Sequence, residues 1–161
     1  KDADSWQEVR EHLPLLGQER WYMQVKRGYA RGWEAARFVD NVRALSIDPV
    51  VVRQNWLKAY DFVTDKAAVT LNEYARDNDP FARVGRQTVA VDVTSVVRAS
   101  DTSFQVRWLE RTFEGGALRD TKRLTGLFSI VITPPRTVDA VRKNPLGIFV
   151  NAINWSKELG Q

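Results

Sequence analysis

The spacing of apolar residues changes near residue 86, and this change limits the fold more than any other feature of the sequence. Upstream, apolar side chains recur every three or four residues, which predicts helices. Downstream, they alternate with polar side chains, which predicts strands that bury one face. Helices first and strands afterwards are typical of the α+β class, in which a helical layer covers one face of an antiparallel sheet.

Three helices are predicted before residue 86. The first covers roughly residues 33–45, and the second begins after Asp48, because an aspartate followed by a proline is a favourable helix start. A third begins at Thr64 or Asp65 and ends before Asp79-Pro80. The spacing predicts that one face of these helices carries the following side chains: Phe38, Val39, Val42, Leu45, Val52, Trp56, Tyr60, Val63, Ala67, Leu71, Tyr74 and Asn78.

Four strands are predicted after residue 86. The first is followed by a turn at residues 99–103, and the second by Glu114-Gly115-Gly116, which is typical of a tight hairpin. In the first two strands the alternation places these side chains on one face: Val89, Val91, Val93, Phe104, Val106 and Trp108.

The third strand is predicted over about residues 118–133, where Gly126 suggests a bulge or a bend. Pro134-Pro135 ends it, because proline cannot donate to a strand ladder. A short helix over residues 137–143 and a last strand over residues 148–155 complete the chain.

The stretch KNPLGIFV, residues 143–150, places a turn signature directly before the last strand. Asn144, Pro145 and Gly147 occupy the positions that a type I turn prefers. We expect the asparagine side chain to bond the backbone two residues on. Two interpretations remain open: the turn only reverses the chain, or it is a surface knob, with Leu146 as its apolar tip, that a partner protein binds.

Composition excludes several kinds of site. The chain has no cysteine and one histidine, His12, in a charged segment where a surface position is expected. We therefore predict no disulfide, metal or cofactor. Basic residues are scattered among acidic ones despite the net charge of +4, so no direct nucleic-acid binding is expected. No apolar run approaches the ~20 residues that span a bilayer, and the polar start does not look like a signal peptide.

Three long segments resemble the TrbF family of conjugal transfer proteins, which are relatives of the VirB-type inner-membrane assembly component of type IV secretion systems. These segments are residues 71–100 (LNEYARDNDPFARVGRQTVAVDVTSVVRAS), 104–116 (FQVRWLERTFEGG) and 132–159 (ITPPRTVDAVRKNPLGIFVNAINWSKEL). The likeness extends from about Trp33 to Leu159.

The resemblance implies a nuclear transport factor 2-like cone, in which N-terminal helices pack on a curved four-stranded antiparallel sheet. It also implies the periplasmic domain of a bitopic bacterial inner-membrane protein, whose N-terminal membrane helix is absent from this chain. In the family, an Asn-Pro-x-Gly motif, here Asn144, Pro145, Leu146 and Gly147, is associated with partner contacts. The implied partners are a second copy, bound weakly, and other inner-membrane and core-complex subunits.

Residues 1–32 do not follow the family's usual entry, and we interpret them as a variant first helix or as foreign sequence. Residues 33–161 are expected to form one periplasmic domain. We predict a non-enzymatic assembly component of a conjugative type IV secretion system. The alternative is a ligand-binding or enzymatic cone, similar to an isomerase or dehydratase, which would need paired acid–base groups inside the cone.

The candidates for that acid–base chemistry are Asp92, Glu110 and Tyr60. Asp92 lies on the polar side of its strand and is expected to be exposed. Glu110 shares the parity of Trp108 and could point inward, although Arg107 and Arg111 nearby offer simple pairing. Cross-strand ion pairs would also account for these acidic residues. These explanations favour a protein without a catalytic site.

Overall fold

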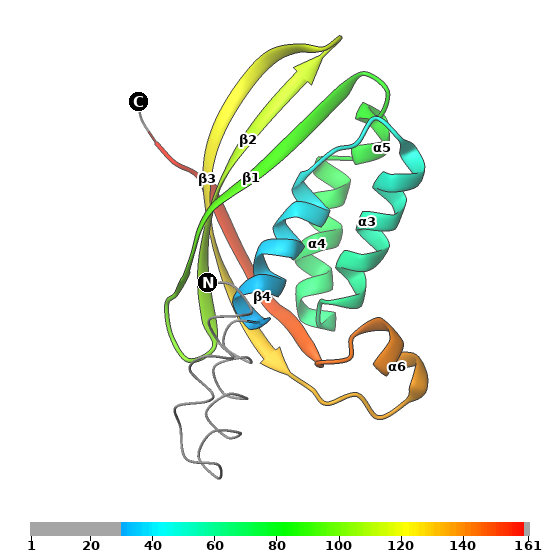
Figure 1. The fold of residues 1–161 in the computed structure, drawn as a ribbon, viewed down its shortest axis with the longest axis vertical. Coiled ribbons are helices and arrows are strands. Elements are labelled where there is room, and N and C mark those ends of the chain that lie inside the picture. The colour runs from blue at the N-terminus through cyan, green and yellow to red at the C-terminus, as the bar shows by residue number, and fades with distance from the viewer. Residues whose placement is uncertain (1–29, 160–161) are drawn as a thin grey trace, which may run out of the picture.

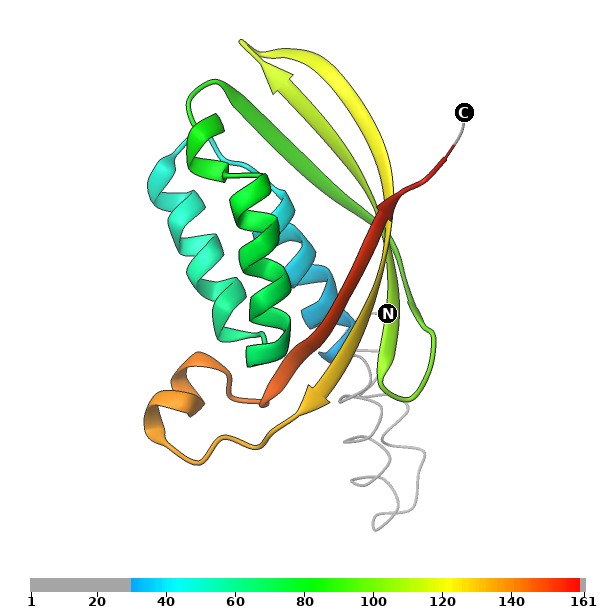
Figure 2. The ribbon, with the colours of Figure 1, turned by 180° about the vertical axis from the view of Figure 1, so that it is seen from behind.

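The change in apolar spacing divides the molecule into a helical layer and a sheet (Figure 1). The computed structural model describes residues 30–159. A helix over residues 30–43 comes first, followed by α3 (Pro49–Asp61), α4 (Asp65–Asp77) and the short α5 (Pro80–Arg83). Figure 2, the opposite view, also shows these helices on one face of a curved sheet. The predicted α+β class is therefore confirmed.

The sheet has four antiparallel strands in the order β1-β2-β3-β4. Their bounds are Gln87–Arg98 for β1, Ser103–Glu114 for β2, Ala117–Ile132 for β3 and Ile148–Lys157 for β4. The short helix α6 (Val138–Lys143) connects β3 to β4 and lies at the end of the molecule where β4 begins (Figure 1). All four strands and this connecting helix lie where the sequence predicted them.

The predicted helix starts are capped by the expected side chains. The Asp48 carboxylate accepts a hydrogen bond from the Val50 amide at 2.8 Å, and the Thr64 hydroxyl accepts one from the Ala67 amide at 3.3 Å. These bonds satisfy amides that have no partner within the helix. Asp79-Pro80 ends α4 as predicted, and Asp79 also caps α5.

Gly126 is not the site of a bulge, so that part of its prediction is wrong. The β2–β3 register shifts at Thr112/Phe113 and the β3–β4 register at Ser129/Ile130, whereas Gly126 pairs regularly with its neighbours on both sides. A Cβ at position 126 would lie 2.6 Å from the Phe128 ring and 3.0 Å from the Trp108 ring. The glycine therefore makes room for aromatic side chains on the buried face of the sheet.

The core lies between the two layers and contains most of the side chains that the spacing predicted. Trp108, Phe38, Phe128 and Leu71 are among its largest fully buried members. Tyr60 is 36% exposed, and its neighbour Ala59 points inward instead. Asn78 is also exposed, as the residue that follows α4. Among the described residues, no helix is both long enough and apolar enough to cross a membrane.

Backbone hydrogen bonds join the helical layer to both edges of the sheet. Leu45, just after the first described helix, exchanges two bonds of 3.0 Å with Val89 of β1. At the other edge, the Thr64 amide donates to Val150 of β4, and the Val150 amide donates to Phe62. The start of β4, directly after the predicted turn, is thus held against the α3–α4 junction.

Candidate functional site

The predicted turn is present directly before β4, and Asn144 forms its buried base. The Gly147 amide donates to the Asn144 carbonyl at 3.1 Å, which closes the turn. The Asn144 carboxamide is also bonded to Ile148: its nitrogen donates to the Ile148 carbonyl at 2.8 Å and its oxygen accepts from the Ile148 amide at 3.2 Å. The expected bond two residues on is therefore wrong, because the side chain points inward to the first residue of β4.

Two constraints favour glycine at position 147: the backbone conformation and the lack of space for a side chain. Its φ is +61°, in the left-handed region that favours glycine. A Cβ there would lie 2.0 Å from the carbonyl oxygen of Thr133, the residue just after β3. The Thr133 amide donates to the Gly147 carbonyl at 2.8 Å, so this close approach is held in place. A side chain at position 147 would break the contact between the two ends of the α6 connection.

The tip of the turn is exposed, in contrast to its buried base. Leu146 is 58% exposed and Pro145 is also exposed, whereas Asn144 is only 3% exposed. Two valines of α6, Val138 and Val141, are exposed close by in the sequence. The turn therefore presents an apolar tip on a base that buried hydrogen bonds hold in position.

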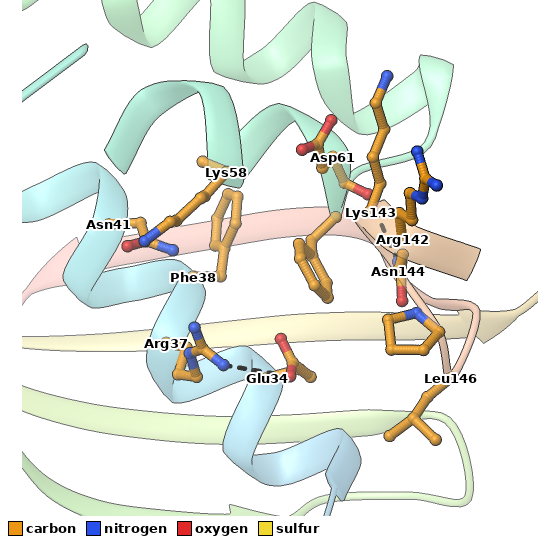
Figure 3. Close-up of a pocket in the computed structure, with 13 residues that line it drawn as sticks. Glu34, Arg37, Phe38, Asn41, Lys58, Asp61, Arg142, Lys143, Asn144 and Leu146 are labelled. Carbon is orange, nitrogen blue, oxygen red and sulfur yellow. Dashed lines mark hydrogen bonds and ion pairs between the residues drawn. The ribbon is translucent and has the colours of Figure 1, made fainter. Parts of the chain in front are cut away.

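A pocket of about 450 Å³ lies beside this turn (Figure 3). It is lined by the helix over residues 30–43, the last turn of α3 with the residue that follows it, and the segment 142–146. Its apolar surface comes from Phe38, Ala59, Phe62, Pro145 and Leu146. Three segments that are far apart in the sequence thus form one hollow next to the exposed tip.

The charged side chains of this pocket are Glu34, Arg37, Lys58, Asp61, Arg142 and Lys143. Burial raises the pKa of Glu34, and the Arg37 guanidinium, 3.9 Å away, opposes that shift only in part. Lys143 pairs with Asp139 of α6 at 3.3 Å. Four cations against two carboxylates give the lining an excess of positive charge.

Glu110 points into the protein as its parity indicated, but its partner is neither of the expected arginines. Arg43, on the first described helix, donates from Nε to Oε1 at 2.5 Å and from Nη2 to Oε2 at 3.0 Å. The Trp108 indole N–H donates to the same carboxylate at 2.9 Å. Arg111 pairs instead with Asp92 at 3.2 Å, and Arg107 lies 3.8 Å from Glu158. Pairing of Glu110 with these arginines fails because Glu110 faces the helices, while Arg107 and Arg111 are more exposed. The predicted cross-strand ion pair is present for Asp92, which lies on β1 diagonally across from Arg111 of β2.

The three candidates for acid–base catalysis do not converge on a common cavity. Glu110 is buried under Arg43, and Asp92 is exposed on β1, as predicted. Tyr60 lies on the outer side of α3, where its hydroxyl donates to Asn72 of α4. Within residues 30–159 no cluster of three or more metal-ligating side chains occurs, and His12 lies outside the described residues.

Comparison with known proteins identifies related sequences. The family model described as VirB8 protein matches residues 29–158. The conjugal transfer protein TrbF of Rhizobium radiobacter is 33% identical over 127 residues, which cover 76% of this chain. The chain spans 57% of the length of that relative. A shorter match of 42 residues, 52% identical to membrane-bound lytic murein transglycosylase F 1 of Alkalilimnicola ehrlichii, covers only 8% of that enzyme.

Solved structures of other proteins share the fold of this chain. The TrwG component of the type IV secretion system of Bartonella birtlesii superimposes with a TM-score of 0.71 at 15% identity, covering 80% of this chain and 91% of that one. VirB8 of Agrobacterium tumefaciens gives a TM-score of 0.69 at 12% identity, covering 83% and 92%. At these identities the likeness concerns the fold, and it supports the predicted cone.

Proposed function

This chain belongs to the VirB8 family, and we propose that it is an assembly component of a conjugative type IV secretion system that acts through protein–protein contacts in the periplasm. The observation that carries the proposal is the exposed Leu146 at the tip of a turn whose base is buried. Asn144 and Gly147 account for the shape of the turn, whereas nothing in the described fold requires an apolar side chain at its tip. An exposed apolar residue on a rigid support is well suited to dock into a partner.

We also propose that the protein is not an enzyme. An acid or base needs a reacting atom within hydrogen-bond reach, and the Glu110 carboxylate is already engaged by Arg43 and Trp108. The 42-residue likeness to a transglycosylase does not alter this, because it covers too little of that enzyme to carry its activity.

The proposed setting is the periplasmic side of the inner membrane, with anchoring through a membrane helix that precedes this domain in the full-length protein. We expect two kinds of partner: a second copy, bound weakly, and other inner-membrane and core-complex subunits. The free domain is expected to associate with micromolar or weaker affinity, about −8 kcal/mol or less. Anchoring in a membrane raises the effective concentration, which makes such a weak contact sufficient.

The proposal is tested with Leu146→Asp in the full-length protein of a conjugating strain. Transfer should fall, since a charge buried without a partner at an interface is strongly penalised, while the melting temperature of the purified domain stays nearly unchanged. Pro145→Ala is the companion variant, because it relaxes the turn for under about 1 kcal/mol. Normal transfer in both folded variants would leave the motif with a purely structural role.

A further inference from the structure

The pocket beside the turn has the composition of a recognition site for a charged and apolar segment. Phe62 contributes aromatic surface above the buried Phe38, and Pro145 and Leu146 line the pocket on the side of the turn. Figure 3 shows the Lys58 side chain extending from α3 toward Asn41 of the first described helix. The tip that the proposed function uses is therefore also one wall of the hollow.

The positive charges of the pocket are only partly neutralised by the protein itself. Arg37 has Glu34 nearby and Lys143 has Asp139. Lys58 and Arg142 form no ion pair with any residue between 30 and 159. Cations beside an apolar surface favour a ligand that combines an apolar group with negative charge, because complementary charge selects and orients a partner.

We propose that this pocket receives an acidic segment of another subunit, with an apolar side chain packed against Phe62 and Leu146 and carboxylates facing Lys58 and Arg142. This inference rests on the proposed function and adds the chemistry of the partner. The segment is a stretch of polypeptide in which Asp or Glu residues flank one bulky apolar residue.

Two other occupants fit the pocket less well. A small inorganic anion would satisfy the cations but would leave the apolar surface in contact with water. A second copy bound about a two-fold axis would bring the same patch of both subunits together. The pocket would then face its own excess of positive charge, and like charges across an interface oppose binding.

The test is charge reversal in the full-length protein of a conjugating strain. Lys58→Glu combined with Arg142→Glu should lower transfer by about tenfold or more, since the reversed charges would face the carboxylates of the partner and like charges across an interface strongly oppose binding. Arg53→Glu is the matched control: Arg53 is exposed on the same helix and does not line the pocket. Its transfer should stay at the wild-type level.

The milder pair Lys58→Gln and Arg142→Gln keeps the inference testable if the reversed variant fails to fold. Normal transfer with folded charge variants, while Leu146→Asp remains defective, would overturn the acidic-partner inference and leave the proposed function standing. Normal transfer in all of these variants, including Leu146→Asp, would overturn both the acidic-partner inference and the proposed function.

A photo-crosslinking amino acid at position 58 then identifies the occupant in the assembled machine. Crosslinks to an Asp- or Glu-rich segment of another subunit support the inference, and exchanging those acids for lysines should restore transfer to the charge-reversed variant. Crosslinks to a second copy of this chain, or failure of the exchange to restore transfer, contradict it.

Discussion

The Arg43–Glu110 pair is expected to be the most sensitive polar contact in the described fold. It joins the first described helix to β2 with two hydrogen bonds, and the Arg43 guanidinium also lies 5.1 Å from the Tyr74 ring centre and 5.3 Å from that of Trp155. Removing one partner of a buried ion pair costs about 3–5 kcal/mol, because it leaves a buried charge without compensation. We therefore expect Arg43→Met to lower the free energy of unfolding by about 4 kcal/mol.

The double variant separates this explanation from a simple loss of packing. Arg43→Met combined with Glu110→Gln removes both charges, and the glutamine oxygen can still accept the Trp108 N–H. Replacing a buried pair with uncharged groups is often close to neutral, while the two cation–π contacts are worth about 0.5–1 kcal/mol each. The double variant should thus lose only about 1–2 kcal/mol, less than Arg43→Met alone.

Urea denaturation followed by far-UV circular dichroism and tryptophan fluorescence measures these quantities. The single variants and the double variant form a double-mutant cycle, whose coupling energy should be about 3 kcal/mol or more. A double variant that loses the sum of the two single losses would show that the residues act independently. A loss below about 1 kcal/mol for Arg43→Met would show that Glu110 reaches solvent once the arginine is removed.

The remaining predictions concern the core, the turn and alkaline pH. Trp56→Ala should cost about 3–5 kcal/mol in urea denaturation, and a loss under about 1 kcal/mol would contradict its burial. Gly147→Ala should lower the free energy of unfolding by more than about 2 kcal/mol, because the new side chain would meet both the positive φ and the Thr133 carbonyl. Gly116→Ala, also at positive φ but with open space around it, should lower it by about 1 kcal/mol. Burial raises the pKa of Tyr74 in the folded state, so the free energy of unfolding should fall as pH rises above 10. Tyr74→Phe should reduce that fall, and an unchanged dependence of stability on alkaline pH in this variant would refute the explanation.

Signals between neighbouring residues of the sequence are sufficient to predict most of the helices and strands. The caps at Asp48 and Thr64, and the alternation through Trp108, depend only on neighbouring residues, so they could be found without a structure. The helical spacing from Trp56 predicts that Tyr60 points inward, yet Ala59 occupies the buried position. A stripe of residues predicts a face of a helix but not the boundary of the buried area.

The contacts of the candidate site could not be predicted, because they join distant parts of the chain. Glu110 pairs with Arg43, 67 residues away, although two arginines stand close to it in the sequence. Asn144 also reaches the Asp61 carbonyl at 3.4 Å, 83 residues away, and the pocket needs the first described helix, α3 and the turn together. Of the features of the site, only the positive φ of Gly147 could be predicted locally, because the turn pattern of the sequence places a glycine there.

The turn before β4 separates residues that shape it from residues that are free to recognise a partner. Asn144 is bonded at both polar atoms of its side chain, and Gly147 has no space for a Cβ, so the fold alone accounts for both identities. A loss of function on changing either one would not distinguish misfolding from lost binding. Leu146 has neither constraint, since it is largely exposed and lines the pocket only at one side. A functional effect of Leu146→Asp at constant stability therefore reports on recognition, and the same reasoning applies to the exposed cations of the pocket.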